Sequence, residues 1–182
     1  GRIDLNGIKC EGDLSVTVST GSARVSGVTC KNFRSDGDTG RLYLGYFEAE
    51  EKITVKRSTG DVSFDNCDAA ELFIETSTGD VEGTLRSDKV FIVRTDTGDV
   101  EVPKTTSGGR CEITTDTGDV TGNLSEAMIF IVSTDTGDIS VPQSLIKITQ
   151  CLYKTMRSLI EDDCSGFLFQ FIQNDLLFLL LK

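Results

Sequence analysis

The chain has 182 residues, which is enough for one domain or for one repeat array with an appendage. Its 18 basic and 29 acidic residues leave a net charge of −11, which disfavours nucleic acid as a partner, because phosphate backbones are bound through Lys and Arg. Histidine is absent, so the usual general base near neutral pH is missing, and this disfavours an enzymatic activity.

The first residues, GRIDLNG, already resemble the middle of a repeat, so we expect a preceding segment to have been removed or truncated. No run of the sequence reaches the roughly 18 apolar residues that a membrane-spanning helix needs. A membrane tether outside this fragment therefore stays open as an alternative.

A short corner, Thr-Gly-Asp, recurs through the chain at a spacing of 19 or 20 residues. The same phase continues backwards to Gly40, Gly21 and Gly1, so that seven periods fill residues 1–137. A fixed period of this length is typical of a solenoid, in which each unit buries its apolar face against its neighbours. The glycines of the complete motif are Gly60, Gly79, Gly98, Gly118 and Gly137.

Apolar residues occupy fixed places relative to each glycine. They stand mostly two and four positions after it and five and seven positions before it, alternating with polar residues, which predicts a strand on each side of the corner. A looser apolar column six or seven positions after the glycine predicts a third face. The column seven positions before the glycine consists of Leu14, Phe33, Ile53, Leu72, Phe91, Cys111 and Phe130.

These columns predict an all-β fold over residues 1–142, a single-stranded parallel β-helix of about seven coils of 19–20 residues. One coil alone would unfold, because ordering each residue costs roughly 1.5 kcal/mol, whereas about five buried side chains contribute about 1.5–3 kcal/mol each. The coils must therefore stack. The crossover rule for parallel strands favours a right-handed winding.

The Thr-Gly-Asp corner has one structural interpretation and two competing functional interpretations, calcium binding and ice binding. Glycine supplies the positive φ of a sharp bend, and the aspartate accepts hydrogen bonds from nearby backbone N–H groups. Calcium is the first competitor, because the aspartates should form a vertical row of oxygen ligands, although the spacing differs from that of calcium-binding nonapeptides. Ice binding is the second competitor, suggested by T-x-T pairs on four successive coils, and it is disfavoured because strand parity turns the first threonine of each pair inward. The pairs are Thr76 and Thr78, Thr95 and Thr97, Thr115 and Thr117, and Thr134 and Thr136. The row of aspartates consists of Asp61, Asp80, Asp99, Asp119 and Asp138.

The cysteines and carboxylates give no sign of a catalytic or cofactor site. Cys10 and Cys30 share a column on adjacent coils, which allows a disulfide, although Ala49 and Ala69 fill that column equally well. The carboxylates recur in step on every coil, whereas a glycoside-cleaving site needs one unique acid and base. We therefore expect no enzymatic activity, no catalytic residues and no cofactor.

An outward column, six positions before the glycine, carries large apolar groups in three coils. Exposed apolar groups of this kind can mark a partner contact. Cover by a loop or by the C-terminal residues is the structural alternative. The three residues are Phe73, Ile92 and Ile131.

Residues 143–182 do not follow the repeat. Their apolar residues are spaced by three and four, which predicts an amphipathic helix. Such a helix would cover the open end of the solenoid, so we expect a short helical cap or, alternatively, a non-native tail without selected structure. The spacing is carried by Leu145, Ile148, Leu152, Met156 and Leu159.

Residues 1–142, with their STGDV and TDTGDV corners, resemble a bacterial adhesin-type family of β-helical domains of unknown function. The resemblance implies an extracytoplasmic protein, at the cell surface or membrane-anchored in a bacterium. It implies a non-enzymatic binding or adhesion module for an unknown cell-surface or envelope ligand, and it supplies no catalytic residues.

A self-associating structural scaffold is the alternative function. Polymers of the bactofilin type are also β-helical, and the exposed edges of the first and last coils would join end to end.

Overall fold

The computed structural model describes residues 1–125, 129–141, 151–154, 167–172 and 175–180. In these ranges the regular structure is entirely β, and none of it is a helix that could span a membrane. The strands are β1 (Arg2–Asn6), β2 (Asp13–Thr20), β3 (Ser22–Thr39), β4 (Leu42–Thr59), β5 (Val62–Thr78), β6 (Val81–Thr97), β7 (Val100–Ser107), β8 (Arg110–Thr117), β9 (Val120–Ser125), β10 (Ile129–Thr136), β11 (Ile139–Ser140), β12 (Cys151–Lys154), β13 (Phe167–Ile172) and β14 (Asp175–Leu180).

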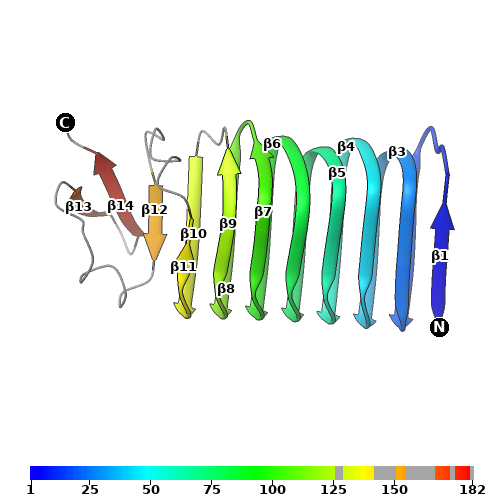
Figure 1. Cartoon of the computed structure of the whole chain (residues 1–182), viewed down its shortest axis with the longest axis horizontal. Helices are drawn as coiled ribbons and strands as arrows, with labels where there is room; N and C mark the ends of the chain where they lie inside the picture. Colours follow the sequence, from blue (N-terminus) through cyan, green and yellow to red (C-terminus); the bar gives the residue numbers. More distant parts are fainter. Residues whose placement is uncertain (126–128, 142–150, 155–166, 173–174, 181–182) are drawn as a thin grey trace.

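Successive coils lie directly on one another and pair in parallel, as the row of strands in Figure 1 shows. Phe91 of β6 lies opposite Cys111 of β8, which in turn lies opposite Phe130 of β10. Residues of the same repeat column are therefore neighbours in space, and the prediction of a parallel β-solenoid of about seven turns is confirmed. The right-handed winding stays a prediction.

Each coil has three hydrogen-bonded segments, which correspond to the three predicted faces. Between β4 and β5, pairing covers residues 42–45, 47–49 and 52–59 of β4, with a register shift before the last segment. The same division recurs between β3 and β4. The chain therefore bends at the Thr-Gly-Asp corner, at a second corner just before the 47–49 segment, and at an irregular third corner.

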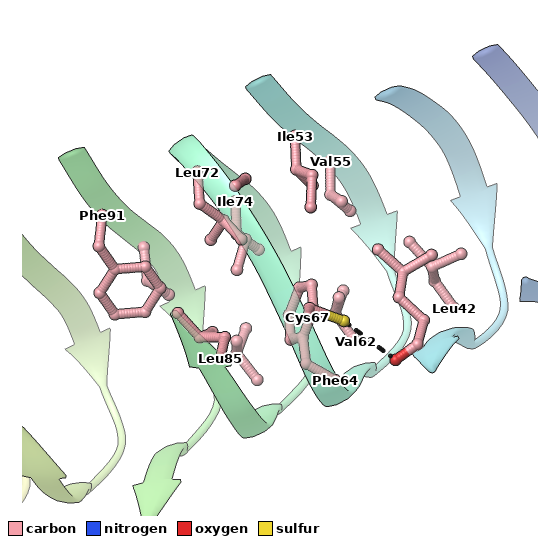
Figure 2. Packing of buried hydrophobic residues seen from close by; sticks show 14 of the residues in the cluster. Leu42, Ile53, Val55, Val62, Phe64, Cys67, Leu72, Ile74, Leu85 and Phe91 are labelled. Carbon is pink, nitrogen blue, oxygen red and sulfur yellow. Dashed lines mark hydrogen bonds between the residues drawn. The ribbon is translucent and has the colours of Figure 1, made fainter. Parts of the chain in front are cut away.

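The apolar columns fill the interior. Figure 2 shows Ile53, Leu72 and Phe91 on three successive strands, all directed into the same core. The rings of Phe33 and Phe47 pack with centroids 4.7 Å apart and join two faces of the solenoid. Each such side chain contributes about 1.5–3 kcal/mol only when the next coil covers it, so stability is a property of the stack.

The predicted C-terminal helix is wrong where the structure describes this region. β12 pairs in parallel with β10, and β13 and β14 form an antiparallel pair that continues the sheet through β14. The open backbone edge of β10 offers N–H and C=O partners, and this pairing outweighs a local spacing of three and four. Leu152 is in a strand, whereas Leu145, Ile148, Met156 and Leu159 lie outside the described residues. The division between residues 142 and 143 stays a prediction.

Candidate functional site

The five glycines of the Thr-Gly-Asp corner stand in one row, with φ between 137° and 152°. This backbone region strongly favours glycine. Space excludes any side chain as well, because a Cβ on Gly98 would overlap the carbonyl oxygen of Gly79 in the preceding coil. The row thus brings the backbones of successive coils into contact.

The aspartates after these glycines form a hydrogen-bonded ladder. The Asp138 N–H donates to Asp119 Oδ1 at 2.8 Å, the Asp119 N–H to Asp99 Oδ1 at 2.8 Å, and the Asp99 N–H to Asp80 Oδ1 at 2.9 Å. Asp80 makes a longer bond of the same kind, 3.3 Å, to Asp61 Oδ1. Each carboxylate therefore holds the backbone of the next coil in place.

The calcium interpretation of this row is not tested by the geometry. One oxygen of each carboxylate from Asp61 to Asp119 accepts a backbone N–H, and Asp61 Oδ2 lies 3.0 Å from Arg41 Nε. Within the described ranges, no group of three or more Asp, Glu or Cys side chains has a metal-binding arrangement. What the row does in this structure is to join coils.

The first threonine of each T-x-T pair is buried beside the corner, as strand parity predicted. Thr115 Oγ1 donates to the carbonyl oxygen of Gly98 at 3.1 Å, and Thr134 Oγ1 donates to that of Gly118 at 3.0 Å. Thr95 makes the equivalent bond to Gly79 at 3.4 Å. Three of the inward threonines thus satisfy glycine carbonyls from inside the solenoid, whereas the buried Thr76 Oγ1 has no partner within the described residues.

Arg57 occupies the same inward position in an earlier coil, and sequence reasoning missed it. Its side chain is only 4% exposed, and Nη2 donates to Ser35 Oγ at 2.8 Å, whereas Nε and Nη1 have no partner. Burial lowers the pKa of Arg57, and the nearby Asp36 partly offsets this. Gly37 leaves room for the guanidinium, because a Cβ there would overlap Nη1. The columns predicted apolar residues and inward threonines in the core, but no cation.

The outward apolar residues lie in one column and are each half-buried. The register Thr54, Phe73, Ile92, Glu112, Ile131 runs across β4, β5, β6, β8 and β10, so that Phe73 and Ile92 are neighbours. Lys52 Nζ lies 4.0 Å from the centre of the Phe73 ring. We call Phe73, Ile92 and Ile131 the outer apolar column.

Glu112 separates Ile92 from Ile131 in this column, and its side chain is only 13% exposed. Arg94 Nη2 lies 3.0 Å from Oε1, and Arg110 Nε donates to Oε2 at 3.1 Å. Burial by itself raises the pKa of Glu112, but the hydrogen bonds and charges of Arg110 and Arg94 outweigh it, so the pKa lies below its ordinary value. No periodic signal marks this cluster, because it occurs once, between Arg94 of one coil and Arg110 and Glu112 of the next.

The second corner was also missed. Its column holds two glycines and two larger residues, all with positive φ: Gly7 at 67°, Gly27 at 61°, Tyr46 at 49° and Asn66 at 51°. A sequence search for glycine corners finds only the first two. Tyr46 is 66% exposed.

Four cysteines fall within the described side chains, and all are free thiols. Cys10 and Cys30 are thus not joined in a disulfide. Burial, assisted by the nearby Cys10 and Asp13, raises the pKa of Cys30 to about 11, and burial raises that of Cys67 to about 12. Both thiols stay protonated near neutral pH and act as small core residues.

The family model described as Toastrack DUF4097 matches residues 1–156. The chain therefore belongs to the Toastrack DUF4097 family, an uncharacterised bacterial domain with a β-solenoid fold. Neither the comparison with curated proteins nor that with solved structures found a match.

Proposed function

We propose that this Toastrack domain is a non-catalytic binding or adhesion module that works outside the cytoplasm, at the surface or membrane of a bacterium. The observation that carries the proposal is the outer apolar column, Phe73, Ile92 and Ile131, on an otherwise polar face. A ligand of the cell envelope that covers this column would remove its apolar area from water.

Neighbouring residues widen the outer apolar column. Ile129 is 38% exposed at the start of β10, and Val90 stands half-buried in the adjacent outward column. Glu112 lies inside this surface with its charge matched by Arg94 and Arg110, which lowers the cost of covering it. The surface thus combines apolar area with a carboxylate whose charge is already paired within the chain.

The distribution of charge supports a binding role over a catalytic one. The aspartates of the corner repeat in step and bond to backbone N–H groups, so none is set apart as an acid or base. The net charge of −11 disfavours nucleic acid and other polyanions as ligands.

Cosedimentation with purified bacterial cell envelopes tests the proposal. We expect the wild-type chain to sediment with the envelopes and the double variant Phe73→Ser, Ile92→Ser to lose at least tenfold in affinity. Ser15→Ala, in the same outward column of an early coil, is the matched control and should bind like the wild type. Equal sedimentation of the double variant and the wild type would refute a contact at the outer apolar column.

A self-associating scaffold is the second candidate, favoured by the parallel backbone pairing of similar coils along the stack. The same pairing between the end coils of two chains would extend the stack into a polymer. Sedimentation velocity at rising chain concentration separates the two functions. Growing filaments would favour the scaffold, and a constant monomer would favour the binding module.

A further inference from the structure

Two residues of the second corner adopt the left-handed backbone conformation, which Asn66 tolerates and which is strained for Tyr46. Tyr46 and Asn66 hold left-handed backbone conformations, with φ of 49° and 51°, in the column where earlier coils have Gly7 and Gly27. The left-handed region costs free energy for residues with a Cβ, and strain of this kind concentrates at functional sites. Tyr46 is 66% exposed, so its ring does not repay this cost by burial.

Tyr43, three residues earlier, is held firmly beside the corner. The Arg24 guanidinium carbon lies 4.5 Å from the centre of its ring. The ring also lies close against the backbone of Gly45, where a Cβ would come within 2.7 Å of Cε1 and Oη. Its hydroxyl donates to Asp65 Oδ2 at 3.3 Å. The ring is therefore fixed from three sides by groups of β3, β4 and β5.

Polar groups of the next coil complete the cluster. Asn66 Nδ2 donates to Asp65 Oδ1 at 2.8 Å, so the carboxylate is oriented by the amide on one side and by the Tyr43 hydroxyl on the other. Burial and Asp65 raise the pKa of the Tyr43 hydroxyl. Tyr46 stands between Gly45 and Phe47, which pair with Asp65 and Cys67, so Tyr46 and Asn66 are neighbours in the column of the second corner. The cluster joins an exposed aromatic ring to a preorganised carboxylate and amide.

We propose that Tyr43, Tyr46, Asp65 and Asn66 form a binding site for a neutral saccharide. A sugar ring has an apolar C–H face and hydroxyl groups around its rim. The C–H face would stack on the exposed Tyr46 ring, whose π face is negative, while Asp65 and Asn66 bond to the hydroxyls. The net charge of −11 selects a neutral sugar over an acidic one.

The saccharide site is separate from the outer apolar column. Tyr43 lies in the 42–45 paired segment of its coil, whereas Phe73 lies in the 71–78 segment, which is the third of the three segments. The saccharide site and envelope binding through Phe73 can therefore fail independently.

The test is titration of the full chain with maltohexaose, cellohexaose and chitohexaose at millimolar concentration, followed by calorimetry and tyrosine fluorescence. The chain has three tyrosines and no tryptophan, so ligand at Tyr43 and Tyr46 changes a readable signal. We expect at least one oligosaccharide to bind. Tyr46→Gly should cut its affinity at least tenfold while the chain unfolds at the same or a higher temperature, because glycine relieves the left-handed strain.

Two matched variants accompany this substitution. Tyr46→Phe keeps the ring and should bind within about threefold of the wild type, and Phe73→Ser should leave saccharide binding unchanged. The proposal is overturned if none of the three oligosaccharides binds, if Tyr46→Gly binds as well as the wild type, or if Tyr46→Gly lowers the unfolding temperature. Envelope cosedimentation without any saccharide binding would overturn this site and leave the envelope-binding module standing.

Discussion

The two glycine-bearing corners of the solenoid obey different rules. At the Thr-Gly-Asp corner, each coil touches the next through glycine carbonyls, aspartate carboxylates and inward threonines. At the second corner, the column changes from glycine to Tyr46 and Asn66 with no change in backbone region. A corner whose side chains bond to the next coil repeats its sequence, whereas a corner joined to its neighbours by backbone pairing is free to carry individual side chains.

The largest loss of stability should come from a substitution in the Thr-Gly-Asp corner, which we call the uniform corner because its sequence repeats. Gly98→Ala places a Cβ at φ 152° against the Gly79 carbonyl oxygen, so strain and overlap act together. We expect a loss of about 3 kcal/mol or more in the free energy of unfolding. Urea denaturation followed by circular dichroism measures it.

Gly7→Ala is the matched control for this loss. Gly7 has φ 67°, and nothing lies within 4 Å of a Cβ built there. The substitution therefore adds backbone strain without overlap and should lower the free energy of unfolding by about 1–2 kcal/mol. Equal losses in the free energy of unfolding for Gly98→Ala and Gly7→Ala would mean that close stacking at the Thr-Gly-Asp corner does not stabilise the fold.

Arg57 is the exception inside the uniform corner, and removing it should stabilise the chain. Arg57→Met keeps most of the volume and removes a buried cation whose Nε and Nη1 have no partner. We expect a gain of about 1–3 kcal/mol in the free energy of unfolding, measured by urea denaturation. The neighbouring exposed Lys56→Met should change it by less than about 1 kcal/mol. A loss of stability in Arg57→Met would mean that the guanidinium is satisfied in solution.

The Glu112 cluster tests whether an individual feature of the outer face also stabilises the fold. The pKa of Glu112 is lowered in the folded chain, so its contribution is present above its ordinary pKa of about 4.5 and is lost as the pH falls below that value through the lowered pKa. Glu112→Gln should therefore cost about 1 kcal/mol at pH 7 and nothing near pH 2. Thermal melts of both chains across this range measure the difference, and a constant gap at every pH would contradict it.

The 19–20-residue repeat was enough to predict the fold of each coil, but not the residues that depart from the repeat. Seven near-copies of one environment made the inward columns, the three faces and the inward Thr115 readable, because each copy repeated the same signal. Arg57, Glu112 and Tyr46 each depart from their repeat column in a single coil, so no periodic pattern predicted them. The helix expected after residue 142 failed for another reason, since pairing of β12 with the β10 edge is a tertiary contact that local spacing does not encode.

The smallest effects concern the aspartate ladder, where water competes with each bond. Asp119→Ala removes the acceptor of the Asp138 N–H and should cost about 1 kcal/mol, with faster hydrogen exchange at that amide. Asp119→Asn keeps an acceptor oxygen and should exchange at nearly the wild-type rate. The exposed Asp116→Ala, two residues before Gly118, is the control and should leave the Asp138 amide unchanged.

Calcium separates a structural ladder from a metal-binding one. If the carboxylates serve the backbone, millimolar calcium should raise the unfolding temperature of the wild type no more than that of Asp119→Ala, because oxygens already bonded to N–H groups must give up those bonds to join the six to eight ligands of the ion. A rise confined to the wild type, with heat of binding in calorimetry, would identify the row as a cation site. The uniform corner would then repeat its sequence for a ligand, and the contrast with the second corner would lose its basis in backbone contact.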